Sequence, residues 1–174
     1  MYKYVLALSG ICVAAALVLG MTYNTTKPLI DEQRDREKRA ALVEVLPQAD
    51  NYVEKEIDGK KYYEAYKEEQ LVGYAIFAIG DGYAGDITML VGIDKSGIIT
   101  GLAVLTNNET PGLGAKCNEI KYGEKDPWFL RQLKGKNGSI IELKDVEAIT
   151  GATITSKAIV DGVREQVLKF FKSL

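Results

Sequence analysis

The chain has 174 residues, of which 47% are apolar, so its length fits one folded domain plus an extension. Its formal net charge is −2, from 22 basic and 24 acidic residues, so no basic excess favours nucleic acid as a partner. The sequence has no histidine, which excludes Ser-His and Cys-His catalysis and histidine-ligated haem or zinc. Its two cysteines are too few for a disulfide scaffold or an iron–sulfur cluster, so any redox chemistry requires an organic cofactor.

The first predicted element is the uncharged stretch YVLALSGICVAAALVLGMTYNTT, residues 4–26. About 20 apolar residues span a bilayer as a helix, and Tyr4 and Tyr23 stand where interfacial aromatic residues are found. The alternative is a cleaved signal peptide with a cut after Gly20, but the apolar region of a signal peptide is normally shorter. We therefore predict an uncleaved transmembrane anchor over residues 1–26.

Basic residues around this stretch specify its orientation only weakly. One lysine and the amino terminus precede it, and five basic residues follow it: Lys27, Arg34, Arg36, Lys38 and Arg39. Counted alone, these charges favour a cytoplasmic position for the following domain. Large domains, however, cross membranes largely regardless of such charges.

The next segment, DEQRDREKRAALVEVLP, has acidic residues first, basic residues next and a proline at its end, Pro47. This order is typical of a helix that the proline stops. We predict a helical connector over residues 27–47, followed by a domain over residues 48–174.

Strand-like segments follow the connector. They are KKYYEAYK (60–67), QLVGYAIFAIG (70–80), ITMLVGID (87–94) and GIITGLAVLT (97–106). The last two are joined by the turn DKSG, which predicts a hairpin. The sequence predicts an antiparallel, meandering sheet.

Helices are predicted after this sheet. Two short ones are expected near residues 115–120 and 127–133, and a final helix begins near Thr155. The apolar stripe of the final helix is Val160, Val163, Val167, Phe170 and Leu174. The predicted fold class is α+β, an antiparallel sheet with packed helices preceded by one amino-terminal transmembrane helix.

A dense group of hydroxyl residues, VEAITGATITSKAIV, precedes the final helix. One interpretation makes Thr155 the helix N-cap and Thr150-Gly151 a turn, which leaves the third threonine, Thr153, unexplained. The other interpretation is an anion site, because backbone N–H groups and the helix dipole favour negative charge there. The local pattern alone is compatible with both.

Two glycine-rich loops stand upstream, in NNETPGLGAK (107–116) and GDGYAGDITMLVGID (80–94). Each by itself has the composition of a surface turn. Neither has the spacing of a P-loop, of a Rossmann fingerprint or of a calcium loop, and we predict no metal site.

Taken together, ETPGLG, GYAGDITMLVGID and TGATITSKAIV resemble the motifs of a family of FMN-binding subunits of bacterial respiratory complexes. Its members are the G subunit of the Rnf complex and the C subunit of the sodium-pumping NADH:quinone oxidoreductase. A single amino-terminal membrane helix before such a domain also fits this family. The short chain is more similar to the G subunit, because the C subunit is typically longer.

The resemblance implies a covalent cofactor. The family motif is Asp-x-x-Ser/Thr-Gly-Ala-Thr, and its last threonine carries FMN through a phosphoester bond. The matching residues are Thr150, Gly151, Ala152 and Thr153, so Thr153 is the implied attachment residue. Glu147 stands where the family usually has aspartate. The resemblance also implies a separate flavin transferase, which uses FAD and a divalent metal.

The resemblance further implies that Thr155 and nearby backbone N–H groups surround the phosphate. The two glycine-rich loops would flank the flavin ring, with Leu113 on a ring face and Thr110 at its polar edge. The predicted cofactor-binding residues are Tyr83, Gly85, Glu109, Thr110, Gly112, Leu113, Gly114, Thr150, Gly151, Ala152, Thr153 and Thr155.

The implied function is an electron-relay subunit, without catalysis of its own, in a complex that passes electrons between ferredoxin and NAD⁺ and moves Na⁺ or H⁺. Its implied partners are the other Rnf subunits and membrane lipid, and the FMN domain would lie on the outer face of the cell membrane.

Two other classes of function stay open. One is a cofactor-free membrane assembly protein. The other is a flavin reductase that binds flavin non-covalently, for which the chain has no nucleotide fingerprint.

Overall fold

A computed structural model describes residues 2–121 and 123–174 of the chain. The chain divides into two compact units, one ending at Lys38 and the other extending from Arg39 to Leu174. The helix α1 (Tyr2–Val45) belongs to the first unit over most of its length, and its end belongs to the second. A helix that ends just before Pro47 was predicted and is confirmed. The helix runs through Pro28 without an interruption.

The amino-terminal part of α1 is long and apolar enough to cross a membrane. An 18-residue window of this helix has a mean hydropathy of 2.3, and none of that window is buried. Apolar side chains exposed all around a helix are expected where lipid is the solvent. This composition agrees with the predicted anchor.

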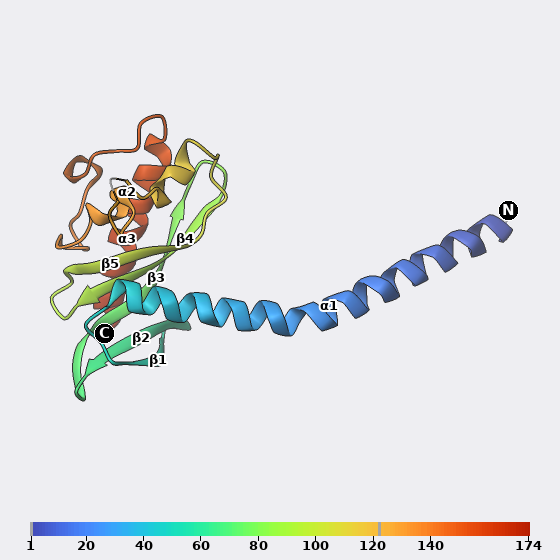
Figure 1. Ribbon diagram of the computed structural model, residues 1–174, viewed down its shortest axis with the longest axis horizontal. Coiled ribbons are helices and arrows are strands. Elements are labelled where there is room, and N and C mark those ends of the chain that lie inside the picture. The colour runs from blue at the N-terminus through green and yellow to red at the C-terminus, as the bar shows by residue number, and fades with distance from the viewer. Residues whose placement is uncertain (1, 122) are drawn as a thin grey trace. The chain divides into compact units, whose positions relative to one another are not determined.

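The second unit is built on one antiparallel sheet of five strands, arranged in chain order (Figure 1). The strands are β1 (Asn51–Ile57), β2 (Lys60–Lys67), β3 (Gln70–Asp81), β4 (Asp86–Asp94) and β5 (Ile99–Thr106). The predicted α+β class and four of the strands are confirmed. β1 was not predicted, because its sequence NYVEKEI is mostly charged and mostly exposed at the sheet edge.

Each face of this sheet is covered by one helix. The long helix α3 (Thr153–Ser173) packs on one face, together with inward-facing side chains such as Ile76, Met89 and Val91. On the opposite face, the end of α1 packs through Leu42 and Val45, together with Leu46, the residue that follows the helix. Side chains alternate between the two faces along the strands, as the period of a β-strand requires.

The backbone of α3 touches the backbone of β3. A β-carbon at Gly162 would lie 2.6 Å from the carbonyl oxygen of Ile79, and one at Gly80 would lie 2.7 Å from the carbonyl carbon of Ala158. Both glycines are buried, so no side chain can separate helix and strand there. This contact holds the first turns of α3 beside the end of β3.

The end of α1 approaches the other face just as closely, over the paired residues Gly92 and Gly101. A β-carbon at Gly101 would lie 2.6 Å from Cα of Val45, and one at Gly92 would lie 2.7 Å from Oγ1 of Thr100. The Thr100 hydroxyl donates a 2.6 Å hydrogen bond to the Val45 carbonyl. These contacts join the end of the helix to the centre of the sheet.

Between β5 and α3 the chain forms loops with three short turns of helix. These are the 3-10 turns η1 (Gly114–Asn118) and η2 (Leu143–Asp145) and the single α-turn α2 (Trp128–Arg131). Helical turns near residues 115–120 and 127–133 were predicted, and η1 and α2 confirm them. α3 begins at Thr153, two residues before the predicted start.

The close approach of α1 gives a testable expectation. Gly92→Ala places a methyl group against Val45 and Thr100, so we expect it to destabilise the domain by about 1–3 kcal/mol, the usual range for overpacking. Urea denaturation of the detergent-solubilised full chain measures this loss. Gly20→Ala is the matched control, because no atom lies within 4 Å of its added β-carbon. Equal midpoints for Gly92→Ala and wild type would contradict the packing described.

The contacts of Glu64 in the β1–β2 hairpin lead us to expect that the stability of the domain depends on pH. Burial by itself raises the pKa of Glu64, but hydrogen bonds from Lys55 at 2.8 Å and from Tyr66 at 2.5 Å outweigh it and hold this pKa below its ordinary value of 4.5. A depressed folded-state pKa gives stability that is present above pH 4.5 and is lost as pH falls through the lower folded value.

We therefore expect Glu64→Gln to lower the free energy of unfolding by about 1 kcal/mol at pH 7, a small value because Lys55 is half exposed. Denaturation at several pH values checks this, and the difference between the two chains should shrink as pH falls below 4.5 and disappear below the folded-state pKa of Glu64. If the two free energies of unfolding differed by a constant amount down to pH 3, the charge of the Glu64 carboxylate would not be the source of the lost stability.

Candidate functional site

A cavity of about 440 Å³ opens where three segments of the second unit meet. The segments are the β3–β4 turn, the loop after β5 and the amino-terminal end of α3. Its lining residues are Tyr83, Glu109, Thr110, Leu113, Gly114, Gly151, Ala152, Thr153, Ile154 and Thr155. Nine of the twelve predicted cofactor-binding residues are among them. The volume lies in the range of about 300–1,000 Å³ that small-molecule sites occupy.

Three predicted residues do not line the cavity. The carbonyl of Gly85 accepts a 3.1 Å hydrogen bond from the Gly82 N–H, so Gly85 shapes the β3–β4 turn. Gly112 and Thr150 are exposed in their loops. Conversely, Ile154 lines the cavity and was not predicted. It lies outside the buried stripe of α3, so the periodicity that identified the helix left this residue unassigned.

The helix α3 begins with an uncapped turn at the cavity. Its N-cap residue is Ala152, which has no side-chain oxygen to accept from the first N–H groups. A helix leaves those N–H groups without intrahelical partners, and its dipole makes this end attractive to anions. Thr153 is the first helical residue and is exposed. The expectation that Thr155 is the N-cap was wrong, because Thr155 lies inside the first turn and its hydroxyl bonds elsewhere.

The Thr155 hydroxyl donates to the buried carboxylate of Glu109, from Oγ1 to Oε2. The other carboxylate oxygen, Oε1, accepts the Ala84 N–H at 2.8 Å. One side chain thereby joins all three segments that form the cavity. Glu109 is only 6% exposed and Thr155 only 1%, so both hydrogen bonds are shielded from water.

Two glycines make room for this carboxylate. A β-carbon at Gly82 would lie 2.6 Å from Oε1 of Glu109. One at Gly114 would lie 2.8 Å from Cβ of Glu109 and 2.5 Å from Oγ1 of Thr155. Sequence reasoning interpreted these glycines as turn formers. The structure shows that they also leave space for a buried acid.

A serine that sequence reasoning did not select fixes the turn before α3. The Ser156 hydroxyl accepts the Ile149 N–H at 2.9 Å and donates to the Ala152 carbonyl at 3.0 Å. Between them Gly151 has φ +77°, a left-handed conformation that glycine adopts without strain. The turn that presents Thr153 is therefore held by side-chain hydrogen bonds on its buried side.

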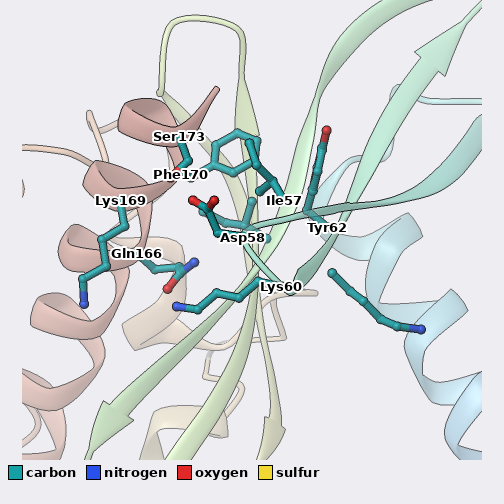
Figure 2. A pocket seen from close by; sticks show the side chains of 10 residues that line it. Ile57, Asp58, Lys60, Tyr62, Gln166, Lys169, Phe170 and Ser173 are labelled. Atoms are coloured by element: carbon teal, nitrogen blue, oxygen red, sulfur yellow. The ribbon is translucent and has the colours of Figure 1, made fainter.

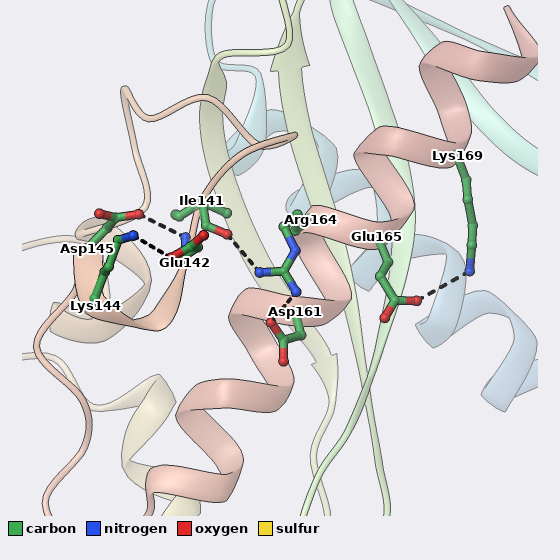
Figure 3. A network of polar contacts seen from close by, with 8 residues as sticks. All are labelled: Ile141, Glu142, Lys144, Asp145, Asp161, Arg164, Glu165 and Lys169. Atoms are coloured by element: carbon green, nitrogen blue, oxygen red, sulfur yellow. Dashed lines mark hydrogen bonds and ion pairs between the residues drawn. The ribbon is translucent and has the colours of Figure 1, made fainter.

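The segment that leads to this turn is tied to α3 and α2. Arg164 on α3 pairs with Asp161 at 2.7 Å and donates to the Ile141 carbonyl at 3.3 Å (Figure 3). The Gln132 amide accepts the Glu147 N–H at 2.8 Å and donates to the Glu147 carbonyl at 3.2 Å. The backbone of Glu147 is thus fixed, whereas its side chain is exposed outside the cavity.

The walls of the cavity are apolar and its floor is acidic. Tyr83, Leu113 and Ile154 are 74%, 45% and 54% exposed, so each presents apolar surface to a ligand. Within the described part of the chain, Glu109 is the only charged side chain that lines the cavity. No group of three or more His, Cys, Asp or Glu in residues 2–121 and 123–174 is arranged to hold a metal ion. The arrangement can hold an anionic group at the helix end and a planar apolar group against the walls.

A second cavity, of about 190 Å³, lies between the β1–β2 turn and the end of α3 (Figure 2). Figure 2 shows Lys60, Asp58, Gln166 and Phe170 around it. It contains none of the predicted cofactor-binding residues. The three sequence motifs therefore converge on the 440 Å³ cavity.

Comparison with known proteins identifies a domain family in the stretch of sequence that includes the residues lining the 440 Å³ cavity. Residues 82–167 match the family model of the FMN-binding domain. The C subunit of the Na⁺-translocating NADH-quinone reductase from Parabacteroides distasonis, whose structure is solved, has a similar fold. Its TM-score is 0.51 at 23% identity, over 64% of this chain and 61% of that one.

Relatives align over nearly the whole chain. The G subunit of a Na⁺-translocating ferredoxin:NAD⁺ oxidoreductase complex from Acetobacterium woodii is 33% identical, over 95% of this chain and 89% of its own length. The G subunit of a proton-translocating ferredoxin:NAD⁺ oxidoreductase complex from Clostridium ljungdahlii is 30% identical, over 90% and 84%. The G subunit of an ion-translocating oxidoreductase complex from Pasteurella multocida is 33% identical, over 99% and 94%. On this identity and coverage, the chain belongs to the family of G subunits of ion-translocating oxidoreductase complexes.

Proposed function

We propose that this protein is a membrane-anchored flavoprotein subunit that carries FMN as an electron relay in an ion-translocating ferredoxin:NAD⁺ oxidoreductase complex. Family membership, the match to the FMN-binding domain and the apolar helix α1 support this assignment. The observation that carries it is the exposed Thr153 hydroxyl at the uncapped end of α3, on the wall of a cavity with apolar sides.

The residues of the cavity fit FMN. The amino-terminal end of α3 suits the phosphate, because its free N–H groups and dipole favour an anion. Tyr83, Leu113 and Ile154 supply apolar surface for the isoalloxazine ring. Thr110 lines the same cavity and is exposed, so its polar groups are available to the polar edge of the ring.

Among the hydroxyls of the motif, burial and position favour Thr153 as the attachment residue. Thr155 is 1% exposed and already donates to Glu109. Ser156 is fully buried and donates to the Ala152 carbonyl. Thr150 is exposed but does not line the cavity. Thr153 alone among these four is exposed and lines the cavity.

The bonds formed and broken in the attachment of FMN balance as follows. A bond forms between Oγ1 of Thr153 and the phosphorus of the FMN half of FAD, and the pyrophosphate bond of FAD breaks. AMP leaves, and the hydroxyl proton is released. A flavin transferase would catalyse this step. Residues of this chain would present the hydroxyl, since Ser156 and Gly151 hold the turn in which it stands.

Bound FMN would supply one-electron transfer chemistry, which belongs to the cofactor, while the protein positions it and sets its electrostatic surroundings. A phosphoester retains the cofactor irrespective of affinity, which suits an open site that exchanges electrons with neighbouring subunits. The alternative of a quinone-reductase C subunit has less support, because the similarity at 23% identity concerns the fold.

The attachment residue can be tested by mass. Co-expression with a flavin transferase should add the mass of FMN less one water to the full chain, and the denatured chain should fluoresce in a gel. Thr153→Val removes the hydroxyl, so both signals should be lost. Thr106→Val, an exposed threonine at the end of β5, is the matched control and should keep both.

Peptide mapping then locates the added mass on the segment that contains Thr153. A wild-type chain without added mass under these conditions would exclude the covalent proposal. It would favour a cofactor-free assembly protein.

We also propose that the FMN domain lies on the outer face of the membrane, as its family implies. Ser173→Cys places a thiol at an exposed position near the carboxyl end. A membrane-impermeant maleimide should label this variant in intact spheroplasts. The wild type should stay unlabelled there, because Cys12 lies in the predicted span and burial raises the pKa of the Cys117 thiol to about 11. Labelling of Ser173→Cys only after lysis would place the domain in the cytoplasm.

A further inference from the structure

We propose that Glu109 is a fixed negative charge in the lining of the cavity, and that it would lower the reduction potential of a flavin bound there. This inference rests on the FMN site proposed above. It concerns a residue whose contacts identify it as more than part of a loop.

Glu109 is buried without a cation. No ion pair to its carboxylate is present among residues 2–121 and 123–174, although nine ion pairs occur elsewhere in them. A buried charge normally costs free energy unless it is paired, so its retention requires compensation. The Ala84 N–H at 2.8 Å, the Thr155 hydroxyl and the positive end of the α3 dipole provide it.

Donors from two other segments satisfy both carboxylate oxygens of Glu109. The Ala84 N–H can only donate, so Oε1 accepts. A carboxylate accepts at both oxygens, and the Thr155 hydroxyl is then free to donate to Oε2. Each acceptor position therefore has a donor from a different segment.

The chain is shaped around this carboxylate. Side chains at Gly82 and Gly114 would collide with Glu109, and the second would also collide with Thr155. If the only task of Glu109 were to join three loops, an uncharged residue of similar shape would do so without the cost of burying a charge. A charge at this place acts in addition on whatever occupies the cavity.

The electrostatic consequence follows from the position of Glu109 in the lining of the cavity. Addition of an electron makes the cofactor more negative, which a nearby carboxylate opposes. A unit charge roughly 10 Å away, at an effective dielectric constant near 20, changes an equilibrium constant by about tenfold. The phosphate on Thr153 would be a second anion at the same helix end, so the two share one source of stabilisation.

The test compares full chains that a co-expressed transferase has flavinylated. Glu109→Gln keeps the size of the side chain and removes its charge. We expect the ratio of reduced to oxidised flavin at a fixed ambient potential to rise about tenfold, a positive shift of about 59 mV for one electron. Glu165→Gln is the matched control, because Glu165 is an exposed carboxylate on α3 outside the cavity. Its midpoint potential should equal that of the wild type.

Two further measurements separate charge from structure. Glu109→Asp keeps the charge on a shorter side chain, so its midpoint should stay near the wild-type value even where its unfolding midpoint falls. The Glu109→Gln shift should also persist at high salt, since salt screens a buried charge weakly.

The inference is overturned by an unchanged midpoint in flavinylated Glu109→Gln, or by an equal shift in Glu109→Asp. Loss of attachment in a folded Glu109→Gln chain would also overturn it, because it would show a structural role. A wild-type chain without flavin would instead remove the proposed function on which the inference rests.

Discussion

The contact of α3 with β3, backbone against backbone, is the constraint on which the site depends. Gly80 and Gly162 allow helix and strand to approach without an intervening side chain. A helix held at this distance has its first turn beside the end of β3, where the β3–β4 turn begins. Only then can the Thr155 hydroxyl and the Ala84 N–H reach the same carboxylate. The cavity is thus a consequence of how closely two elements pack.

The electrostatics of the cavity explain why a covalent bond would be useful there. The amino-terminal end of α3 favours an anion. The Glu109 carboxylate lies at the same end, so its negative charge offsets part of the positive potential there. No lysine or arginine lines the cavity within the described residues, so a phosphate would find hydrogen-bond donors but no paired charge. Attachment through Thr153, as proposed, would keep the cofactor in place whatever the balance of these interactions. Glu109 would then be free to tune the reduction potential of the cofactor, because binding would no longer depend on favourable charges in the cavity.

Sequence patterns predicted the parts of the fold that periodicity and turn chemistry determine. Four strands and the long helices follow from apolar residues at strand or helix spacing. β1 was not predicted, because the edge strand NYVEKEI buries too few side chains to show an alternation of apolar and polar residues. The start of α3 was placed two residues late, because Thr155 has the residue type of a cap although its hydroxyl bonds to a distant acid.

The sequence predicted which loops form the site, but it did not predict the hydrogen bonds that join them. Nine cavity residues came from three motifs and the family they resemble. Ile154 was missed because it lies outside the buried stripe of α3. Ser156 and Gln132 were missed because their roles are hydrogen bonds to backbone groups that only the folded chain brings near. The role of Glu109 as the common partner of two other segments likewise depends on a contact across 46 residues.

That sequence separation has a consequence for the order of folding and cofactor attachment. The turn that presents Thr153 is held by Ser156 of α3, and α3 packs on a sheet whose strands precede it in the chain. A flavin transferase that recognised this turn would therefore modify the chain only once α3 had packed on the sheet. Such an enzyme would pass over chains whose sheet had not formed, and the yellow colour of the cofactor would then mark protein whose domain has folded.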